Sequence, residues 1–144
     1  MILRPAVPSD RAMILAAAER LAKVLYPKLE VDFPKMAAGI SEAVSSANNF
    51  CWIAEKDGAL GAVLLAMVAQ NNWAKKRFCS VLLWVSDIPG AGVKLLRKFR
   101  EWIRGRKGVK VAGFAPDTDT DPRIWQLVER VGFKKCGGAY LLYN

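Results

Sequence analysis

The sequence has 144 residues, 53% hydrophobic and 24% charged, which is typical of one soluble globular domain spanning residues 1–144. It contains no histidine, which excludes serine–histidine and cysteine–histidine catalysis and the usual zinc ligands, so we expect no metal. The three cysteines lack metal-ligand spacing, and we find neither a signal peptide nor an apolar run long enough to span a membrane. Cys51 and Cys79 lie within apolar strand patterns, so we expect buried free thiols in a cytoplasmic protein with no membrane partner.

The formal net charge of +9 indicates attraction to an anionic partner such as a phosphorylated cofactor, an acidic protein or nucleic acid. Much of this charge lies between Lys94 and Lys110. The arginines there do not interleave with aromatic residues as in single-strand binding platforms. The pattern favours a solvated helix face, and nucleic acid is the less favoured partner.

The first half of the chain predicts a strand, two helices and an antiparallel hairpin. Ser9 and Asp10 are candidate N-caps of the first helix, and Pro34 is expected at the first position of the second. Asp57-Gly58 is a typical hairpin turn. The expected ranges are strand 2–6, helix 12–25, helix 34–44, strand 50–55 and strand 60–68.

The stretch from Ser80 to Ala115 organises the rest of the chain. It predicts a buried strand over 81–85, a glycine turn, a helix from Val93 and a second strand over 109–114. A glycine turn that leads into a helix N-terminus leaves backbone N–H groups pointing outward, which suits phosphate. The alternative is a tight turn without a ligand. The apolar face of the helix comprises Leu95, Leu96, Phe99, Trp102 and Ile103.

The acidic loop before the last helix predicts capping rather than cation binding, because its carboxylates lack the spacing of a calcium loop. Asp121 is the expected N-cap, Pro122 the first helical residue and Gly132 a left-handed C-cap. The remaining expected elements are a helix over 124–131, a turn at 137–138 and a strand over 139–143.

This order of elements resembles the GNAT superfamily of acyl-CoA N-acyltransferases over the whole chain. Residues 2–6 with Ser9-Asp10 are similar to the family's opening strand and cap, and Gly90-Ala91-Gly92-Val93 occupies the place of its pyrophosphate loop. Glu129-Arg130-Val131-Gly132-Phe133 is similar to its tail motif. The resemblance implies an α/β (α+β) fold, with a mixed, mostly antiparallel sheet of six to seven strands flanked by about four helices.

The resemblance also implies an activity, the direct transfer of an acetyl group from acetyl-CoA, as co-substrate, to an amine. Strand residues would hydrogen-bond the pantetheine arm, and backbone N–H groups of the turn would hold the pyrophosphate. The cofactor-binding residues that it implies are Trp84, Val85, Gly90, Ala91, Gly92, Val93 and Lys94.

The sequence departs from the family at two places. The arginine or glutamine of the family's loop falls on Pro89 or Asp87, and the tyrosine that often serves as general acid falls on Val128. Asp87 is a candidate base, although turn capping is favoured for it. Compact GNAT-like chains with such departures occur in bacteriophages, some of them not evident enzymes, and this chain is similar to them.

We expect the acceptor, a small-molecule or protein amine, to contact the second helix and the loop from Gln70 to Arg77, whose basic residues favour an acidic acceptor. Trp73 and the hairpin are candidates for a homodimer interface as well as for the core. Two alternatives stay open: a non-catalytic binding or phage structural protein, and a basic binder of nucleic acid or acidic protein whose affinity falls steeply with salt.

Overall fold

The computed structural model describes residues 1–25, 27–28, 30–69, 75–114, 121–136 and 139–143. The strands are β1 (Ile2–Pro5), β2 (Phe50–Lys56), β3 (Ala59–Ala69), β4 (Arg77–Ser86), β5 (Val109–Phe114), β6 (Lys134–Cys136) and β7 (Ala139–Tyr143). The helices are the 3₁₀ turn η1 (Pro8–Asp10), α1 (Arg11–Leu25), α2 (Phe33–Ser45), α3 (Ala91–Arg104) and α4 (Pro122–Val131). In this described part, no helix is long and apolar enough to cross a membrane.

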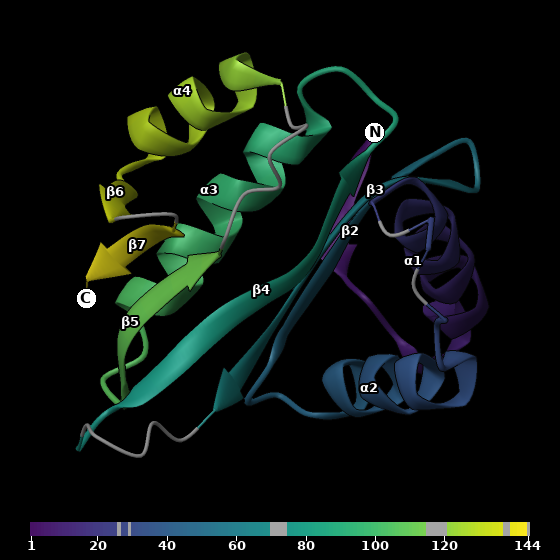
Figure 1. Cartoon of the computed structure of the whole chain (residues 1–144), viewed down its shortest axis with the longest axis horizontal. Coiled ribbons are helices and arrows are strands. Elements are labelled where there is room, and N and C mark those ends of the chain that lie inside the picture. The colour runs from purple at the N-terminus through teal and green to yellow at the C-terminus, as the bar shows by residue number, and fades with distance from the viewer. Residues whose placement is uncertain (26, 29, 70–74, 115–120, 137–138, 144) are drawn as a thin grey trace.

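All seven of these strands belong to one sheet, in the order β1-β2-β3-β4-β5-β7-β6 (Figure 1). Neighbouring strands are antiparallel except β4 and β5, which run parallel because α3 connects them. Within the described residues, the mixed sheet and its four α-helices confirm the fold class expected from the sequence.

Helices cover both faces of the sheet. Helices α1 and α2 lie on one face, and α3 and α4 lie on the other (Figure 1). On β3, Leu64 belongs to the buried cluster on the α3 side, whereas Val63 and Leu65 belong to the cluster on the α1–α2 side. Because both faces are covered, this central strand is apolar at nearly every position instead of alternating.

Helix α3 provides the centre of the larger core. Its expected apolar face is buried, with Leu95, Leu96, Phe99 and Ile103 inaccessible to solvent. The ring of Phe99 packs against that of Phe50 at 5.1 Å between centroids. The helix is thereby fixed against the sheet, which places its N-terminus at the end of β4.

The expected turns and caps of the hairpin and of α4 are confirmed. Asp57 and Gly58 both have positive φ, 54° and 75°, as a two-residue hairpin turn requires. The Asp121 carboxylate accepts a hydrogen bond of 2.9 Å from the Arg123 N–H at the start of α4. Gly132 ends α4 with φ 114°, a conformation that strongly favours glycine.

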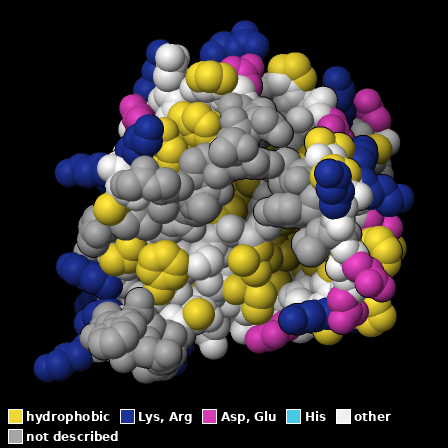
Figure 2. All heavy atoms as spheres, viewed as in Figure 1, with side chains coloured by type: hydrophobic (Ala, Val, Ile, Leu, Met, Phe, Trp, Pro, Cys, Tyr) yellow, Lys and Arg dark blue, Asp and Glu magenta, His cyan; other side chains and the backbone are white. Residues whose placement is uncertain are grey.

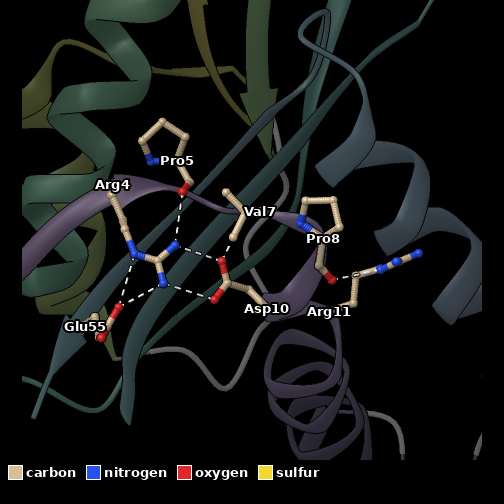
Figure 3. Close-up of polar contacts among 7 residues, drawn as sticks. All are labelled: Arg4, Pro5, Val7, Pro8, Asp10, Arg11 and Glu55. Carbon is tan, nitrogen blue, oxygen red and sulfur yellow. Dashed lines mark hydrogen bonds and ion pairs between the residues drawn. The ribbon is translucent and has the colours of Figure 1, made fainter. Parts of the chain in front are cut away.

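Asp10 is not the simple N-cap that the sequence suggested. Residues 8–10 form η1, which leads directly into α1, and the Asp10 carboxylate accepts from the Val7 N–H at 2.8 Å. Only 3% of Asp10 is exposed, and both of its oxygens bind the Arg4 guanidinium, at 2.8 and 3.0 Å (Figure 3). Arg4 also binds Glu55 of β2 at 2.8 Å. This network ties β1, η1 and β2 together.

Several elements differ from what the sequence predicts. Strand β4 begins at Arg77, inside a segment expected to be a connection, and Pro34 is the second residue of α2 rather than the first. Strand β6 was not expected at all, because its three exposed residues carry no alternating pattern and become a strand only by pairing with β7. The expected turn at 137–138 and the candidate interface residue Trp73 lie outside the described residues.

Candidate functional site

Strand β4 pairs with β5 only along its first residues, because β5 pairs through Gly113 and ends one residue later at Phe114. Residues 77–80 of β4 pair with β5, whereas from Val81 onward β4 has no strand partner on that side in the described part of the chain. Its other edge stays paired with β3. A β-bulge at Leu82 lies just beyond the residues paired with β5, because the residues on either side of Leu82 pair with consecutive residues of β3. Among the described residues, the backbone groups on this edge of β4 are therefore left without a strand partner.

The turn after β4 leads into α3 through Gly90, whose φ of 79° favours glycine. Among the described residues, the N–H groups of Gly90 and Val93 have no acceptor. Lys94 follows on the exposed surface of the same helical turn. Free N–H groups, the positive end of the helix dipole and an ammonium group suit a phosphate-sized anion.

The other two residues of the predicted phosphate loop face the protein instead. Ala91 is buried, and its N–H donates to Ile88 O at 3.1 Å. The Gly92 N–H donates to the Ser86 hydroxyl at 3.1 Å, and the Gly92 carbonyl accepts from Trp84 Nε1 at 3.2 Å. These contacts hold α3 against β4 and leave fewer N–H groups for a ligand than the sequence suggested.

Gly92 is closely packed against β4. A Cβ at this position would lie 3.1 Å from Ser86 Cβ and 3.2 Å from Trp84 Nε1. We expect Gly92→Ala to lower the free energy of unfolding by about 1–3 kcal/mol. Gly39→Ala is the matched control, because a Cβ there meets nothing within 4 Å, and we expect it to raise stability by about 0.5–1 kcal/mol. Urea denaturation measures both, and equal effects would contradict the packing argument.

The turn is anchored on β3 by a contact that the sequence analysis missed. The Ile88 side chain lies directly over Gly61, where a Cβ would come within 2.0 Å of Ile88 Cδ1. The Asp87 N–H donates to Gly61 O at 2.7 Å, and the Ser86 hydroxyl donates to Ile88 O at 2.8 Å. The available signal was a glycine inside an otherwise apolar strand, which often marks a close approach.

Asp87, the candidate base, forms an ion pair with Arg20 of α1 at 2.7 Å. Both side chains are more than half exposed, so the pair contributes little to stability. Its local effect is to place a guanidinium beside the one carboxylate of the turn, which reduces repulsion of an anionic ligand. The assignment of Asp87 as a base stays a prediction.

A cavity of about 400 Å³ lies beside the turn. Trp84, Ser86, Gly90 and Val93 line it from β4 and α3, and Ile124 and Leu127 line it from α4. A second cavity, of about 490 Å³, lies on the other face of the sheet between α1, α2 and β3–β4. Both cavities are within the size range of small-molecule sites.

Among the C-terminal side chains that the structure describes, none of those considered as a general acid can act as one at this site. Val128, at the position of the family's tyrosine, is completely buried. Tyr140 is 4% exposed and stacks on Trp125 at 5.0 Å, in the core. The side chain of Tyr143, the other tyrosine considered on the last strand, lies outside the described residues.

The structure confirms that two of the cysteine thiols lie in the core, as the sequence predicts. Cys51 and Cys79 are buried free cysteines, and burial raises the pKa of each thiol to about 12, so neither is a thiolate at neutral pH. Cys136 is free and exposed. Across the described ranges, no three cysteine or carboxylate side chains gather as they would around a metal ion.

Comparison with solved structures gives the fold. A ribosomal-protein-alanine N-acetyltransferase from Brucella melitensis is similar over 100% of both chains, with a TM-score of 0.81 and 16% identity. A GNAT-family acetyltransferase from Brucella melitensis, crystallised with acetyl-CoA, has a TM-score of 0.71 and 19% identity over 99% of this chain and 86% of its own. An aminoglycoside acetyltransferase from a soil metagenome, crystallised with sisomicin, has a TM-score of 0.65 and 12% identity over 91% and 86%.

The chain therefore has the GNAT fold, as the sequence resemblance implied. No protein-family model and no curated protein sequence matches it. At identities below 20%, these likenesses concern the architecture, and the activity has to be argued from the residues of the site.

Proposed function

We propose that this protein transfers an acyl group, acetyl in the simplest case, from acyl-CoA to an amine. The observation that carries the proposal is the unpaired edge of β4 directly beside the N-terminus of α3. An extended ligand with a phosphate group fits such a site, because one part can pair with the strand and the other with the helix N-terminus. A protein of the same fold crystallised with acetyl-CoA supports this choice of ligand.

In this proposal, the Gly90 and Val93 N–H groups and the Lys94 ammonium hold the pyrophosphate. The pantetheine arm follows the open edge of β4 from Trp84 and Val85 toward the bulge at Leu82. Arg20, paired with Asp87 at 2.7 Å, offsets the negative charge of the turn. The residues present therefore fit the ligand although the family's loop arginine or glutamine is absent.

The reaction is a direct attack. The neutral amine nitrogen forms a bond to the thioester carbonyl carbon, the carbon–sulfur bond breaks, and CoA leaves as a thiolate. The nitrogen loses one proton, and one proton reaches the sulfur through solvent. Positioning and backbone donors supply most of the rate, so a missing acid costs only about 10²–10⁴-fold.

A non-catalytic role is the second candidate. It is favoured by the internal hydrogen bonds of Ala91 and Gly92, which leave two N–H groups for a phosphate, and by the buried Val128 at the place of the usual acid. A protein that binds CoA without transferring an acyl group would satisfy the same geometry. Binding and turnover therefore have to be measured separately.

We expect acetyl-CoA to bind, and Lys94→Glu to weaken binding about tenfold or more, because an ammonium beside the pyrophosphate becomes a carboxylate. Lys107→Glu is the matched control. It makes the same change of charge beyond the opposite end of α3, about 20 Å away along the helix, where we expect less than a threefold effect. Titration calorimetry at fixed salt measures both.

Equal losses in the two variants would indicate a general charge effect and contradict the proposed phosphate position. Absence of binding at millimolar acetyl-CoA would overturn the proposed function. Binding without release of CoA in the presence of a broad amine panel would select the non-catalytic alternative.

A further inference from the structure

The cavity between α1, α2 and the sheet, here called the α1–α2 pocket, is apolar and open because small residues line its helical walls. Ala18 and Ala22 of α1 and Gly39 of α2 border it. The larger lining side chains are Leu21, Met36, Leu65, Met67, Leu82 and Leu83. Its volume of about 490 Å³ is enough for a small organic molecule, and its two methionines can adapt to the shape of one. Figure 2 shows hydrophobic side chains gathered near the middle of the face in view.

The charges on the lining of this pocket are mainly acidic. Glu30 and Asp32 line it from the segment before α2, and Lys35 is the one cation among the lining residues. Two carboxylates and one ammonium give this group a net charge of −1, in a protein whose formal net charge is +9. Asp32 Oδ1 accepts from the Lys35 N–H at 3.0 Å, which fixes the carboxylate at the start of α2. A ligand with a positive charge beside an apolar body matches this pocket better than an anionic ligand does.

The pocket borders the part of β4 that extends beyond its pairing with β5. Leu82, the bulged residue of β4, lines the pocket and is 61% exposed. A ligand in the pocket therefore approaches the open edge of β4 at the bulge, from the face opposite α3. No residue of the described basic segment, Lys75, Lys76 and Arg77, lines this pocket, and Lys35 is the one cation among its lining residues.

We propose that the α1–α2 pocket binds a primary amine with an apolar aliphatic or aromatic body, and that Glu30 and Asp32 attract its ammonium group. The inference that this amine is the acyl acceptor rests on the proposed function, in which the bound ammonium first loses one proton to solvent and the neutral amine then attacks. Binding of the amine in the pocket does not require acyl-CoA, and the two can be tested apart.

The probe is 2-phenylethylamine, compared with 2-phenylethanol, which has a similar body but no positive charge. We expect the amine to bind at least tenfold more tightly than the alcohol in titration calorimetry. The double variant Glu30→Gln/Asp32→Asn should abolish this preference while retaining an N-cap acceptor at residue 32. Equal affinities of amine and alcohol for the parent protein would overturn the role of the carboxylates.

Gly39→Leu tests the location, because a side chain there extends into the pocket without meeting another atom at its Cβ. We expect it to reduce amine binding at least tenfold, whereas Gly108→Leu, at another glycine with open space around its Cβ, should leave binding unchanged. Unchanged binding in a folded Gly39→Leu protein would overturn the proposal. If that variant does not fold, the double variant at the exposed residues Glu30 and Asp32 still decides it.

Acetyl-CoA binding, measured on the same samples, separates this inference from the proposed function. Acetyl-CoA binding without amine binding would overturn the pocket assignment alone. Amine binding without acetyl-CoA binding would support the pocket and overturn the proposed transfer. Binding of both, followed by acetylation of the amine that Gly39→Leu abolishes, would support both.

Discussion

Asp10→Ala is expected to lower the free energy of unfolding by about 3 kcal/mol at pH 7, because it removes one partner of a buried ion pair. Arg4 would lose its two hydrogen bonds to Asp10 and the Val7 N–H would lose its acceptor. This energy is at the lower end of the range for buried ion pairs, because Arg4 is partly exposed and keeps its ion pair with Glu55. Urea denaturation gives the difference.

Asp10→Asn separates charge from hydrogen bonding, since the amide can still accept from the Val7 N–H. Asp121→Asn is its matched control, because Asp121 also binds an arginine but at the exposed start of α4. We expect a clear loss of stability for the first and little change for the second. Equal effects would show that burial of the pair is not important.

The same network predicts a dependence on pH. Hydrogen bonds from Arg4 are the main reason why the pKa of Asp10 lies below its usual value, and partial desolvation opposes them. The stabilisation that the Asp10 carboxylate gives to the folded state is therefore complete above the unfolded-state pKa of about 3.9. It is lost as the pH falls through the lower folded-state pKa. Stability curves of the parent and Asp10→Asn should converge as the pH falls from about 5 toward 3, and parallel curves would contradict this origin.

Gly61→Val is expected to weaken acetyl-CoA binding about hundredfold, if the chain binds acetyl-CoA as proposed. A Cβ at residue 61 would lie 2.0 and 2.6 Å from two side-chain carbons of Ile88, so the Ile88 side chain must shift. Valine adds two further methyl groups at this place, and we therefore expect the turn that carries Ile88 to shift as well. The Gly90 and Val93 N–H groups would then be displaced. Two hydrogen bonds to a charged group are together equivalent to about 3 kcal/mol or more, which corresponds to this factor.

A rescue experiment tests the cause. Ile88→Ala in the Gly61→Val background removes the clashing atoms and should restore affinity to within about tenfold of the parent, with Ile88→Ala alone as the control. Calorimetry measures binding, and circular dichroism confirms folding. Parent-like binding by a folded Gly61→Val protein would show that the turn does not hold the phosphate, whereas failure of the parent to bind concerns the proposed function itself.

Local sequence patterns were sufficient for most of the secondary structure. The helical spacing of Leu95, Phe99 and Ile103 predicted the buried face of α3, and Asp57-Gly58 predicted the hairpin, because periodicity and turn chemistry depend on neighbours in the chain. Strand β6 was missed because its pairing with β7, and not its own residues, makes it a strand.

The candidate site was only partly predictable. The glycine turn and the helix N-terminus after it follow from the sequence, but the sequence does not distinguish a glycine that faces a ligand from one that packs against a strand. Gly90 is the N-cap of α3 and has a positive φ that favours glycine, whereas Gly92 packs closely against Ser86 and Trp84. Asp87 was noted as a carboxylate, and its partner Arg20 could not be, because the two are far apart in the chain.

The sequence by itself determined the identity and order of the main elements, the apolar face of α3 and the absence of histidine chemistry. Those properties arise from composition and from residues at most a few positions apart. The tertiary structure alone decided the Arg4–Asp10–Glu55 network, the position of Ile88 over Gly61 and the acidic, apolar pocket between α1 and α2. Each of these depends on the distance between distant segments, which is set only when the helices pack on the sheet.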